Sequence, residues 1–321
     1  MSRELLLLRH GKSDWSVDSD DYRRPLKNRG KRGAQRIGAW LQQQALFPDL
    51  VLSSPAVRAL VTAQKCCKAG GGSGQIQEDS RLYLADRDEL LAVLADCPPT
   101  AQRVMLVGHN PGLEELLRYL VHEPIEIPAD GKLLPTASLA HLILPDGWRT
   151  PKAGQARLLQ LIRATSLPKK FPAATPDDKV LRDRPAYYYT QSAVIPYRLN
   201  RGRVEILIIR SSSNKHWGIP KGIAEPGLSL QESAAKEALE EAGIEGEVAL
   251  AAIDSYVYQK WGSTCTVSVY PMAVQRQLPE AQWQESHRRR QWVSAGKATG
   301  LLKQTALGPM VMALAKQLKR E

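Results

Sequence analysis

Short apolar runs alternate with amphipathic segments through the first half of the chain. Three of these runs are predicted strands: Leu5–Leu8, Leu50–Leu52 and Val104–Val107. Helical spacing predicts a helix capped by Asn28, and two more that open at Ser54-Pro55 and Asn110-Pro111. The last of them carries an apolar stripe, formed by Leu113, Leu116, Leu117 and Leu120. This alternation predicts an α/β domain whose sheet is flanked by helices.

The second half has a different pattern. Thr190–Pro196 and Val204–Ile209 are predicted to form a β-hairpin. A helix is predicted from Ser229 to Ala242, with the capping-box spacing of Ser229 and Glu232 at its start and Gly243 as its stop. Two further strands and a last helix are predicted at Ile253–Tyr258, Thr264–Val269 and Pro309–Leu318. The pattern predicts an α+β domain.

A segment between the two halves fits neither pattern. The run LPKKFPAATPDD, which begins at Leu167, carries three prolines and paired charges without useful periodicity. We therefore predict two domains, residues 1–165 and 187–321, joined by a linker over residues 166–186. The length of 321 residues is consistent with two cores.

Composition narrows the class of protein. There are 44 Lys and Arg against 33 Asp and Glu, a net charge of +11, which favours polyanionic partners such as nucleotides, polyphosphates or nucleic acid. No apolar run approaches the length of about 18–20 residues that spans a bilayer, so we expect no membrane partner. The four cysteines show no metal-ligand or disulfide spacing, which favours reduced thiols and a cytoplasmic location.

Polar groups follow the three predicted strands of the first half at comparable places. Arg9-His10 follows the first strand, Ser54 with Arg58 one turn later follows the second, and His109 follows the third. The carboxyl ends of parallel strands meet at one edge of an open sheet, beside helix N-termini that favour anions. Two arginines and two histidines converging there predict a phosphate site.

The motifs LLRHGKS, SSPAVRALVTA and VGHNP, in this order, resemble the histidine phosphatase superfamily, specifically its small SixA-like branch of phosphohistidine phosphatases. The resemblance implies that His10 attacks phosphorus and that Arg9, Arg58 and His109 hold the phosphoryl oxygens. A water molecule then releases phosphate, and no metal is needed. Three points stay open: Lys12 and Arg24 line the pocket rim or are solvated, and the proton donor is unassigned, with candidates Asp86, Asp88 and Glu89.

A second constellation lies on the helix predicted after Ser229. Glu237, Glu240 and Glu241 fall at i, i+3 and i+4, so they share one helical face. Such a face is often a solvated surface paired with lysines, and Lys236 is placed to pair with Glu240. The functional interpretation is a site for Mg²⁺, with Mn²⁺ as an alternative, because a hard divalent cation removes the repulsion between the carboxylates.

The surrounding sequence resembles the Nudix box of pyrophosphohydrolases. Gly222, Glu237, Glu240, Glu241 and Gly243 match the family pattern in register. The resemblance implies an α+β Nudix fold, metal binding by the three glutamates and catalysis through Glu241. Two positions depart from the pattern, Leu228 for a glutamate and Lys236 for an arginine. Since those residues mainly brace the loop against the helix, Glu225 or Glu232 is a candidate replacement for the brace.

Details of the box resemble the diphosphoinositol polyphosphate and diadenosine polyphosphate hydrolase branch. This likeness rests on the run from Trp217 to Gly222 and on the later Arg288-Arg289-Arg290. It implies that Lys221, Gly222 and Arg289 bind substrate, and that Glu285 is a possible general base. Lys215 and the other two arginines are further candidates for gripping phosphates. Trp217, Tyr258 and Trp261 are candidates for stacking on adenine, although such aromatics mostly pack.

The leading hypothesis is a bifunctional phosphohydrolase. One site would cleave phosphoanhydride bonds in a polyphosphorylated metabolite, and the other would dephosphorylate a small molecule or a phosphohistidine protein. An alternative is a phosphohistidine phosphatase regulated by a Nudix module that senses nucleotides and has lost catalysis. RNA binding or decapping ranks last, because no aromatic-basic RNA motif is present.

Overall fold

The computed structural model describes residues 3–72, 76–145, 147–149, 151–172 and 180–319. The chain forms two compact units, Met1–Leu181 and Arg182–Glu321. Positions 173–179 of the predicted linker lie outside the described residues, and the limits of the two domains remain predictions. Among the described helices, none is both long and apolar enough to cross a bilayer.

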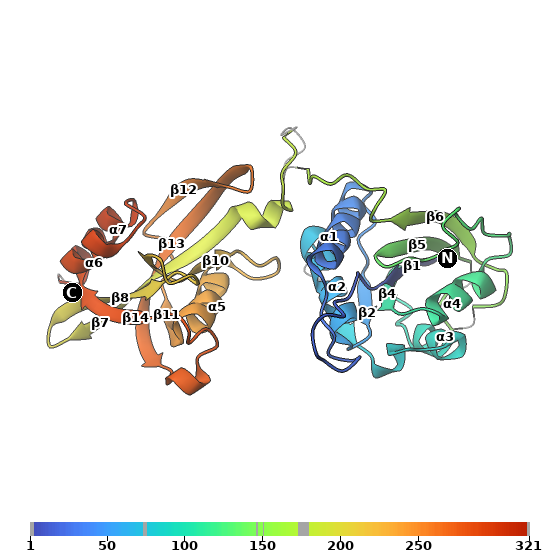
Figure 1. Cartoon of the computed structure of the whole chain (residues 1–321), viewed down its shortest axis with the longest axis horizontal. Coiled ribbons are helices and arrows are strands. Elements are labelled where there is room, and N and C mark those ends of the chain that lie inside the picture. The colour runs from blue at the N-terminus through green and yellow to red at the C-terminus, as the bar shows by residue number, and fades with distance from the viewer. Residues whose placement is uncertain (1–2, 73–75, 146, 150, 173–179, 320–321) are drawn as a thin grey trace. The chain divides into compact units, whose positions relative to one another are not determined.

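The first unit is built on a six-stranded sheet in the order β3-β2-β4-β1-β5-β6 (Figure 1). The strands are β1 (Arg3–Arg9), β2 (Leu50–Ser53), β3 (Ile76–Glu78), β4 (Arg103–Gly108), β5 (Ser138–Leu144) and β6 (Arg157–Arg163). The first four strands in this order pair in parallel, whereas β5 and β6 are antiparallel additions. The three predicted strands are confirmed as β1, β2 and β4, and their carboxyl ends lie at one edge.

Helices cover both faces of this sheet. They are α1 (Asn28–Gln43), α2 (Val57–Ala69), α3 (Arg87–Ala95) and α4 (Gly112–Leu120), with a 3-10 turn η1 at Ser80–Leu82. Leu5 and Leu7 pack with α3 and α4, whereas Leu6 and Leu8 pack with α1 and α2. Side chains alternate across a strand, so a strand buried on both faces is apolar throughout. The predicted stripe of α4 is fully buried.

Three predicted caps are wrong in detail. Asn28 is the first residue of α1, and α2 begins at Val57, two residues beyond Pro55. Asn110 instead donates from Nδ2 to Glu114 Oε1 at 2.6 Å, and Pro111 precedes α4. The Ser54 and Asn110 side chains are thus held at the sheet edge, which places them beside the predicted phosphate site.

The second unit contains an eight-stranded mixed sheet whose main path is β11-β13-β7-β8-β14. Beside that path, β10 pairs with β7, β12 with β13 and β9 with β8. The strands are β7 (Thr190–Asn200), β8 (Arg203–Arg210), β9 (Trp217–Gly218), β10 (Lys221–Ile223), β11 (Ile244–Val248), β12 (Asp254–Lys260), β13 (Ser263–Gln277) and β14 (Arg290–Ser294). The predicted hairpin is confirmed as β7 and β8.

Three α-helices pack on this sheet: α5 (Leu230–Ala242), α6 (Ala295–Leu301) and α7 (Leu307–Gln317). Two 3-10 turns complete the unit, η2 (Ala186–Tyr189) and η3 (Glu280–Gln282). Ile206 and Ile208 of β8 pack toward α6 and α7, whereas Leu207 and Ile209 pack toward α5. The predicted start and stop of α5 are both confirmed, since Ser229 and Glu232 form a capping box and Gly243 is left-handed. The α5 glutamates are therefore fixed in phase from both ends.

Candidate active sites

The first site lies at the carboxyl edge of the parallel strands in the first unit. A pocket of about 330 Å³ there is lined by all four predicted site residues: Arg9, His10, Arg58 and His109. Lys12 and Arg24 also line it, so the structure places both at the pocket and not in open solvent. Three segments distant in sequence thus converge, as the strand-end pattern predicts.

His10 is held in one tautomer by its neighbour. Its Nδ1 lies 2.7 Å from the carbonyl oxygen of Gly11, which can only accept, so Nδ1 donates and Nε2 keeps its lone pair. The Gly11 N–H donates in turn to Thr62 Oγ1 at 2.9 Å. Burial, reinforced by the neighbouring arginines, lowers the pKa of His10 to about 4. His10 is thus a neutral imidazole with a free nitrogen, the form that a nucleophile requires.

His109 has one ring nitrogen bound and one free. Its Nε2 lies 2.9 Å from Ser54 Oγ, which also accepts from the Ala56 N–H. Its Nδ1 is buried and has no partner among the described residues. Burial, with the charge of His10 and two arginines, lowers the pKa of His109 to about 3. In the tautomer in which the Ser54 hydroxyl donates to Nε2, Nδ1 carries the ring proton and is a donor that suits a phosphoryl oxygen.

The low pKa values of both histidines predict a specific titration. They should stay neutral down to about pH 5 in the folded chain, instead of protonating near 6.5. Because the unfolded histidines take up protons first, stability should fall as pH drops from about 6.5 toward 4. Histidine ring NMR checks this, with signals assigned from His10→Gln and His109→Gln variants. Midpoints near 6.5 for both rings would contradict it.

The arginines differ in how they are engaged. Arg9 donates from Nη1 to the Leu134 carbonyl at 2.6 Å, while its buried Nε has no partner in the described part of the chain. Arg58 donates from Nη2 to Asp21 Oδ2 at 2.8 Å, and Arg24 pairs with the other oxygen of Asp21. An internal carboxylate therefore occupies Arg58, which the resemblance assigns to phosphate, together with Arg24, whose role the sequence left open.

Asp21 is the functional candidate that sequence analysis missed. It also accepts from the hydroxyl of Tyr83 at 2.8 Å, and its side chain is 42% exposed. The three predicted proton donors lie elsewhere: Asp86 and Glu89 form the capping box of α3, and Asp88 pairs with Arg87. Among the described residues that line the pocket, Asp21 alone carries a carboxylate. The sequence feature that could have indicated Asp21 is its spacing from Arg24, three residues away, which suits an ion pair.

Replacing Asp21 by asparagine should strengthen inhibition of this site by orthophosphate, by about three- to tenfold. The change removes the internal anion that competes for Arg58 and Arg24. Inhibition constants for the wild type and Asp21→Asn give the test. Asp20→Asn is the control, since Asp20 pairs with the exposed Arg23 in the same loop. Weaker inhibition would mean that Asp21 positions the guanidinium groups and does not compete with phosphate.

The second site lies on α5 of the second unit. The predicted helical face is present, but the three glutamates do not form one ligand set. Glu241 accepts from Arg288 Nη2 at 2.6 Å and from the Lys221 N–H at 3.0 Å, and Glu240 lies 3.4 Å from Lys236 Nζ. Within the described residues, no group of three or more His, Cys, Asp and Glu is arranged to hold a metal ion. In this conformation nearby cations draw two of the carboxylates aside, and the assignment of the three glutamates as metal ligands stays a prediction.

Glu237 has the environment of an unsatisfied carboxylate. No hydrogen bond or ion pair of its side chain is found in the part of the chain that the structure describes. Burial, then the charges of Glu241 and Glu240, raises the pKa of Glu237 to about 7. A β-carbon on Gly222 would overlap the carboxylate, so the glycine leaves the space that the carboxylate fills. A buried anion beside two others, without a cation, fits a divalent metal.

Replacing Gly222 by alanine should abolish metal-dependent hydrolysis while leaving the fold intact. The added methyl meets the tip of Glu237, a flexible side chain that moves away. We expect activity to fall by more than about a hundredfold, as for loss of a metal ligand. Activity and thermal unfolding measure the two effects, with Gly296→Ala as a control in open space. Unchanged turnover in a folded Gly222→Ala protein would exclude this position of Glu237 during catalysis.

The departures from the Nudix pattern are compensated in part. Lys236 Nζ donates to Glu225 Oε1 at 2.8 Å, so an ion pair links the loop to α5. The backbone N–H of Glu225 also donates to Ser233 Oγ at 3.0 Å. Glu232 is used in the helix cap. Leu228 is 41% exposed and takes no part in the contact between the loop and α5. Of the two replacements that the sequence suggests, Glu225 therefore makes the brace.

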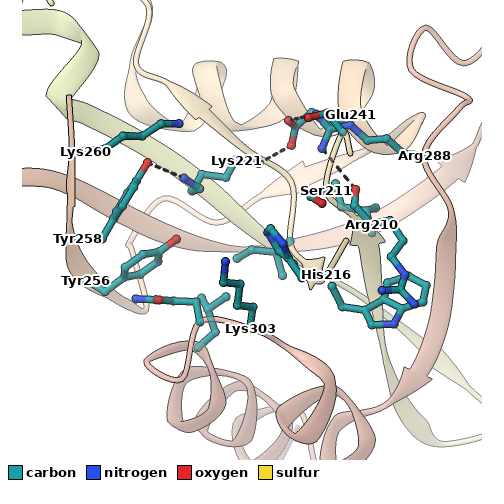
Figure 2. A pocket seen from close by; sticks show the side chains of 17 residues that line it. Arg210, Ser211, His216, Lys221, Glu241, Tyr256, Tyr258, Lys260, Arg288 and Lys303 are labelled. Atoms are coloured by element: carbon teal, nitrogen blue, oxygen red, sulfur yellow. Dashed lines mark hydrogen bonds and ion pairs between the residues drawn. The ribbon is translucent and has the colours of Figure 1, made fainter. Parts of the chain in front are cut away.

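Beside the glutamates lies a basic pocket of about 430 Å³ (Figure 2). Lys221 is its central cation and donates from Nζ to Gln191 Oε1 at 3.0 Å and to the Tyr258 hydroxyl at 2.9 Å. Burial lowers the pKa of Lys221, although Glu241 opposes the shift. Further cations line the pocket from other elements: Arg210, Lys260, Arg288 and Lys303. His216 also lines it, and burial together with Lys303 and Arg210 lowers the pKa of this histidine. This excess of donors suits an extended polyanion.

The predicted substrate residues are only partly placed at this pocket. Lys221 lines it, whereas Gly222 lies against the carboxylate of Glu237. Arg289 is exposed and does not line it, whereas its neighbour Arg288 does and also contacts Glu285. Arg290 donates to backbone carbonyls at the end of α5. Register along β14 and its preceding loop decides which of three identical residues faces the site, so the sequence alone could not.

Two of the three aromatic candidates line this pocket, and the third does not. Trp217 lines the pocket with Arg210 stacked 4.3 Å from its ring centre, and Tyr258 lines it together with Tyr256. Trp261 does not line it and packs edge-to-face on Tyr188 instead. Three residues were missed: Arg210 and Lys303, which line the pocket, and Gln191, which accepts from Lys221. Only the pairing of the sheet and the α6–α7 connection bring them to this site.

Comparison with known proteins matches two families, one in each unit. Residues 189–312 match the NUDIX domain, and residues 5–83 match the histidine phosphatase superfamily (branch 1). The chain is 32% identical over 152 residues to Nudix hydrolase 21, chloroplastic, of Arabidopsis thaliana, a match that covers 41% of this chain and 75% of the relative.

Two solved structures are also similar. A protein of Nakamurella multipartitia, described as a candidate phosphohistidine phosphatase SixA, is 27% identical, with a TM-score of 0.45 over 51% of this chain and 96% of that one. The binary complex of a C. elegans Ap4A hydrolase is 20% identical, with a TM-score of 0.36 over 41% of this chain and 99% of that one.

Proposed function

The chain belongs to the Nudix hydrolase family and carries a histidine phosphatase superfamily region in its first half, and we propose that both sites are active and independent. Both families are hydrolases that act on phosphate esters and anhydrides. The proposal concerns what each site cleaves and through which residues. The observation that carries it is the set of unsatisfied groups among the described residues: free donors around His10, and a free carboxylate at Glu237.

At the first site, His10 Nε2 attacks the phosphorus of a phosphomonoester or phosphohistidine, forming the N–P bond as the bond to the leaving group breaks. Arg9 Nε, Arg58 and His109 Nδ1 hold the three non-bridging oxygens, on which charge develops. A water molecule then attacks the phosphohistidine and releases phosphate. The neutral state of His10 supports this role, because a protonated ring has no lone pair to donate.

At the second site, Glu237, Glu240 and Glu241 would hold Mg²⁺, or Mn²⁺ as a substitute. Such a cation supplies charge neutralisation for a pyrophosphate group and acidifies a bound water. Lys221 binds phosphate oxygens, since its hydrogen-bond partners Gln191 and Tyr258 are neutral. Arg288 connects Glu241 to Glu285, the candidate general base. Release of Glu241 from Arg288 is the rearrangement that the ligand set requires.

We propose a polyphosphorylated metabolite as the substrate of this second site, of the diadenosine polyphosphate or diphosphoinositol polyphosphate type. Support comes from the cations of the basic pocket, which outnumber Glu241, the single carboxylate among the described residues that line it. Trp217, Tyr256 and Tyr258 offer faces for a base. A cytoplasmic location is part of the same proposal, supported by cysteines that are all free and buried.

A substrate panel tests the proposal. The full chain is assayed with diadenosine polyphosphates, an inositol pyrophosphate, inorganic polyphosphate, capped RNA and a phosphohistidine peptide, each with Mg²⁺ and with EDTA. We expect phosphoanhydride cleavage only with Mg²⁺ and phosphohistidine cleavage in both conditions. Cleavage of capped RNA alone would replace the metabolite assignment by decapping, and loss of phosphohistidine cleavage in EDTA would contradict the metal-free first site.

A further inference from the structure

A second pocket adjoins the His10 site in the first unit. Its volume is about 320 Å³, and it is formed between the first three turns of α1 and the segments that carry Lys132 and Thr165. Lys12 and Thr136 line both this pocket and the His10 pocket. The two cavities are therefore neighbours that share a wall, and one compact ligand can extend from the first into the second.

The second pocket is cationic throughout. Four basic side chains line it, Lys12, Arg29, Arg36 and Lys132, and no acidic residue among those described does. In the described part of the chain, none of the four side chains makes a hydrogen bond or an ion pair, and the buried Nε of Arg36 is among the unpartnered atoms. The nearby acids are used elsewhere, since Asp130 pairs with Arg163 and Asp14 lies beside Lys27.

The packing of α1 brings these cations together. Arg29 and Arg36 are seven residues apart, so they lie on one face of the helix, two turns from each other. A β-carbon at Gly30 would lie 2.7 Å from the backbone nitrogen of Lys12, and one at Gly33 would lie 2.9 Å from the Ala137 Cβ. Gly30 therefore allows α1 to lie close against the loop after β1, and Gly33 allows it to lie close against the residue before β5.

This arrangement costs free energy unless an anion is present. Burial, and then the charge of Arg32, lowers the pKa of Arg36, which means that its charged form is disfavoured where it lies. Like charges at a concave surface repel one another and concentrate anions. Thr136 and Thr165 add hydroxyl donors, so the pocket can bind the oxygens of a tetrahedral anion on several sides.

We propose that this pocket is a second phosphate subsite, and that the first unit acts on small molecules with at least two phosphate groups. One phosphate lies at His10 while another lies between Arg29, Arg36 and Lys132. The inference rests on the proposed function of the His10 site and specifies its substrate. A compact ligand is favoured over a protein surface, because the donors line a pocket of small-molecule size and not a flat face.

Competitive inhibition at the His10 site tests this in the full chain. Turnover of p-nitrophenyl phosphate in EDTA reports on that site, and His10→Ala verifies that the signal comes from it. We expect inorganic tripolyphosphate to inhibit at least about tenfold more tightly than orthophosphate, since it reaches both pockets. The double variant Arg29→Gln/Arg36→Gln should lose most of this difference. Arg32→Gln, on the same helix but outside the pocket, should keep it.

The outcomes separate the inference from its premise. If His10→Ala does not reduce turnover, the proposed function of the site fails, and the subsite with it. If turnover depends on His10 but tripolyphosphate inhibits no better than orthophosphate, the subsite alone is overturned. If the double variant slows release of phosphate from a phosphohistidine protein while tripolyphosphate inhibition is unchanged, the pocket serves a protein partner, and the small-molecule assignment is wrong.

Discussion

Replacing Glu237 by glutamine is expected to reduce metal-dependent phosphoanhydride hydrolysis by more than about a hundredfold. The carboxylate lies buried against Gly222 beside two other glutamates, and its charge has no partner among the described residues. Glutamine keeps the shape of the side chain but cannot supply the negative charge that a divalent cation needs. Initial rates on the best substrate of the panel, at saturating Mg²⁺, provide the measurement.

The same variant should be more stable than the wild type when metal is absent. The pKa of Glu237 is raised to about 7 in the folded chain. At pH 8 the side chain is charged in both states, but only in the folded state does burial disfavour that charge, so the charge destabilises the fold. Glutamine removes that penalty. Thermal unfolding in EDTA should therefore occur at a higher temperature in Glu237→Gln. Adding Mg²⁺ should raise the unfolding temperature of the wild type but not of the variant.

Glu247→Gln is the matched control, because Glu247 is an exposed glutamate on β11 in the same unit. It should leave both the rate and the Mg²⁺ response unchanged. If the wild type binds a nucleotide but hydrolyses nothing in the panel, and Glu237→Gln changes only binding, the sensing-module alternative replaces catalysis. In that case Leu228 becomes the first position to restore to glutamate, since the Glu225–Lys236 pair would be an insufficient brace.

The second large effect is expected from His10→Ala, which should abolish phosphatase activity at the first site by at least about a thousandfold. The residue supplies the only protein atom that bonds to phosphorus in the proposed reaction, and no neighbour among the described pocket residues is assigned that role. Its ring lies 5.1 Å from that of His109, but His109 Nε2 is already engaged with Ser54 Oγ at 2.9 Å. Trapping of a phosphorylated enzyme with labelled substrate provides a direct readout.

Independence of the two sites is part of this prediction. His10→Ala should leave metal-dependent hydrolysis at the wild-type rate, and Glu237→Gln should leave phosphatase activity at the wild-type rate. A His141→Gln variant is a useful comparison, because His141 is buried and bonded to Glu4 on the sheet, away from the pocket lining. If a folded His10→Ala protein loses both activities, the sites are coupled, and the proposal of two independent enzymes is wrong.

Much of this architecture follows from local sequence pattern. Continuous apolar runs predicted β1, β2 and β4, because strands covered on both faces need apolar residues throughout. The polar residues that end those strands must then meet at one edge, so the pattern alone groups His10, Arg58 and His109. The cap and stop of α5 are equally local, and they set the phase of its three glutamates. By contrast, β5 and β6 were not predicted, because the pairing of β5 with β1, on which β6 is then added, depends on contacts distant in sequence.

Two folds, two sets of candidate residues and the class of chemistry thus follow from the amino-acid sequence, since each depends on periodicity or on motifs within a few residues. Which charges meet follows instead from the three-dimensional structure. It placed Asp21 on Arg58, joined Glu225 to Lys236, and turned Arg288 toward Glu241 in preference to Arg289. Ion pairs between segments far apart in sequence depend on the register and packing of whole elements, and no local pattern contains that information.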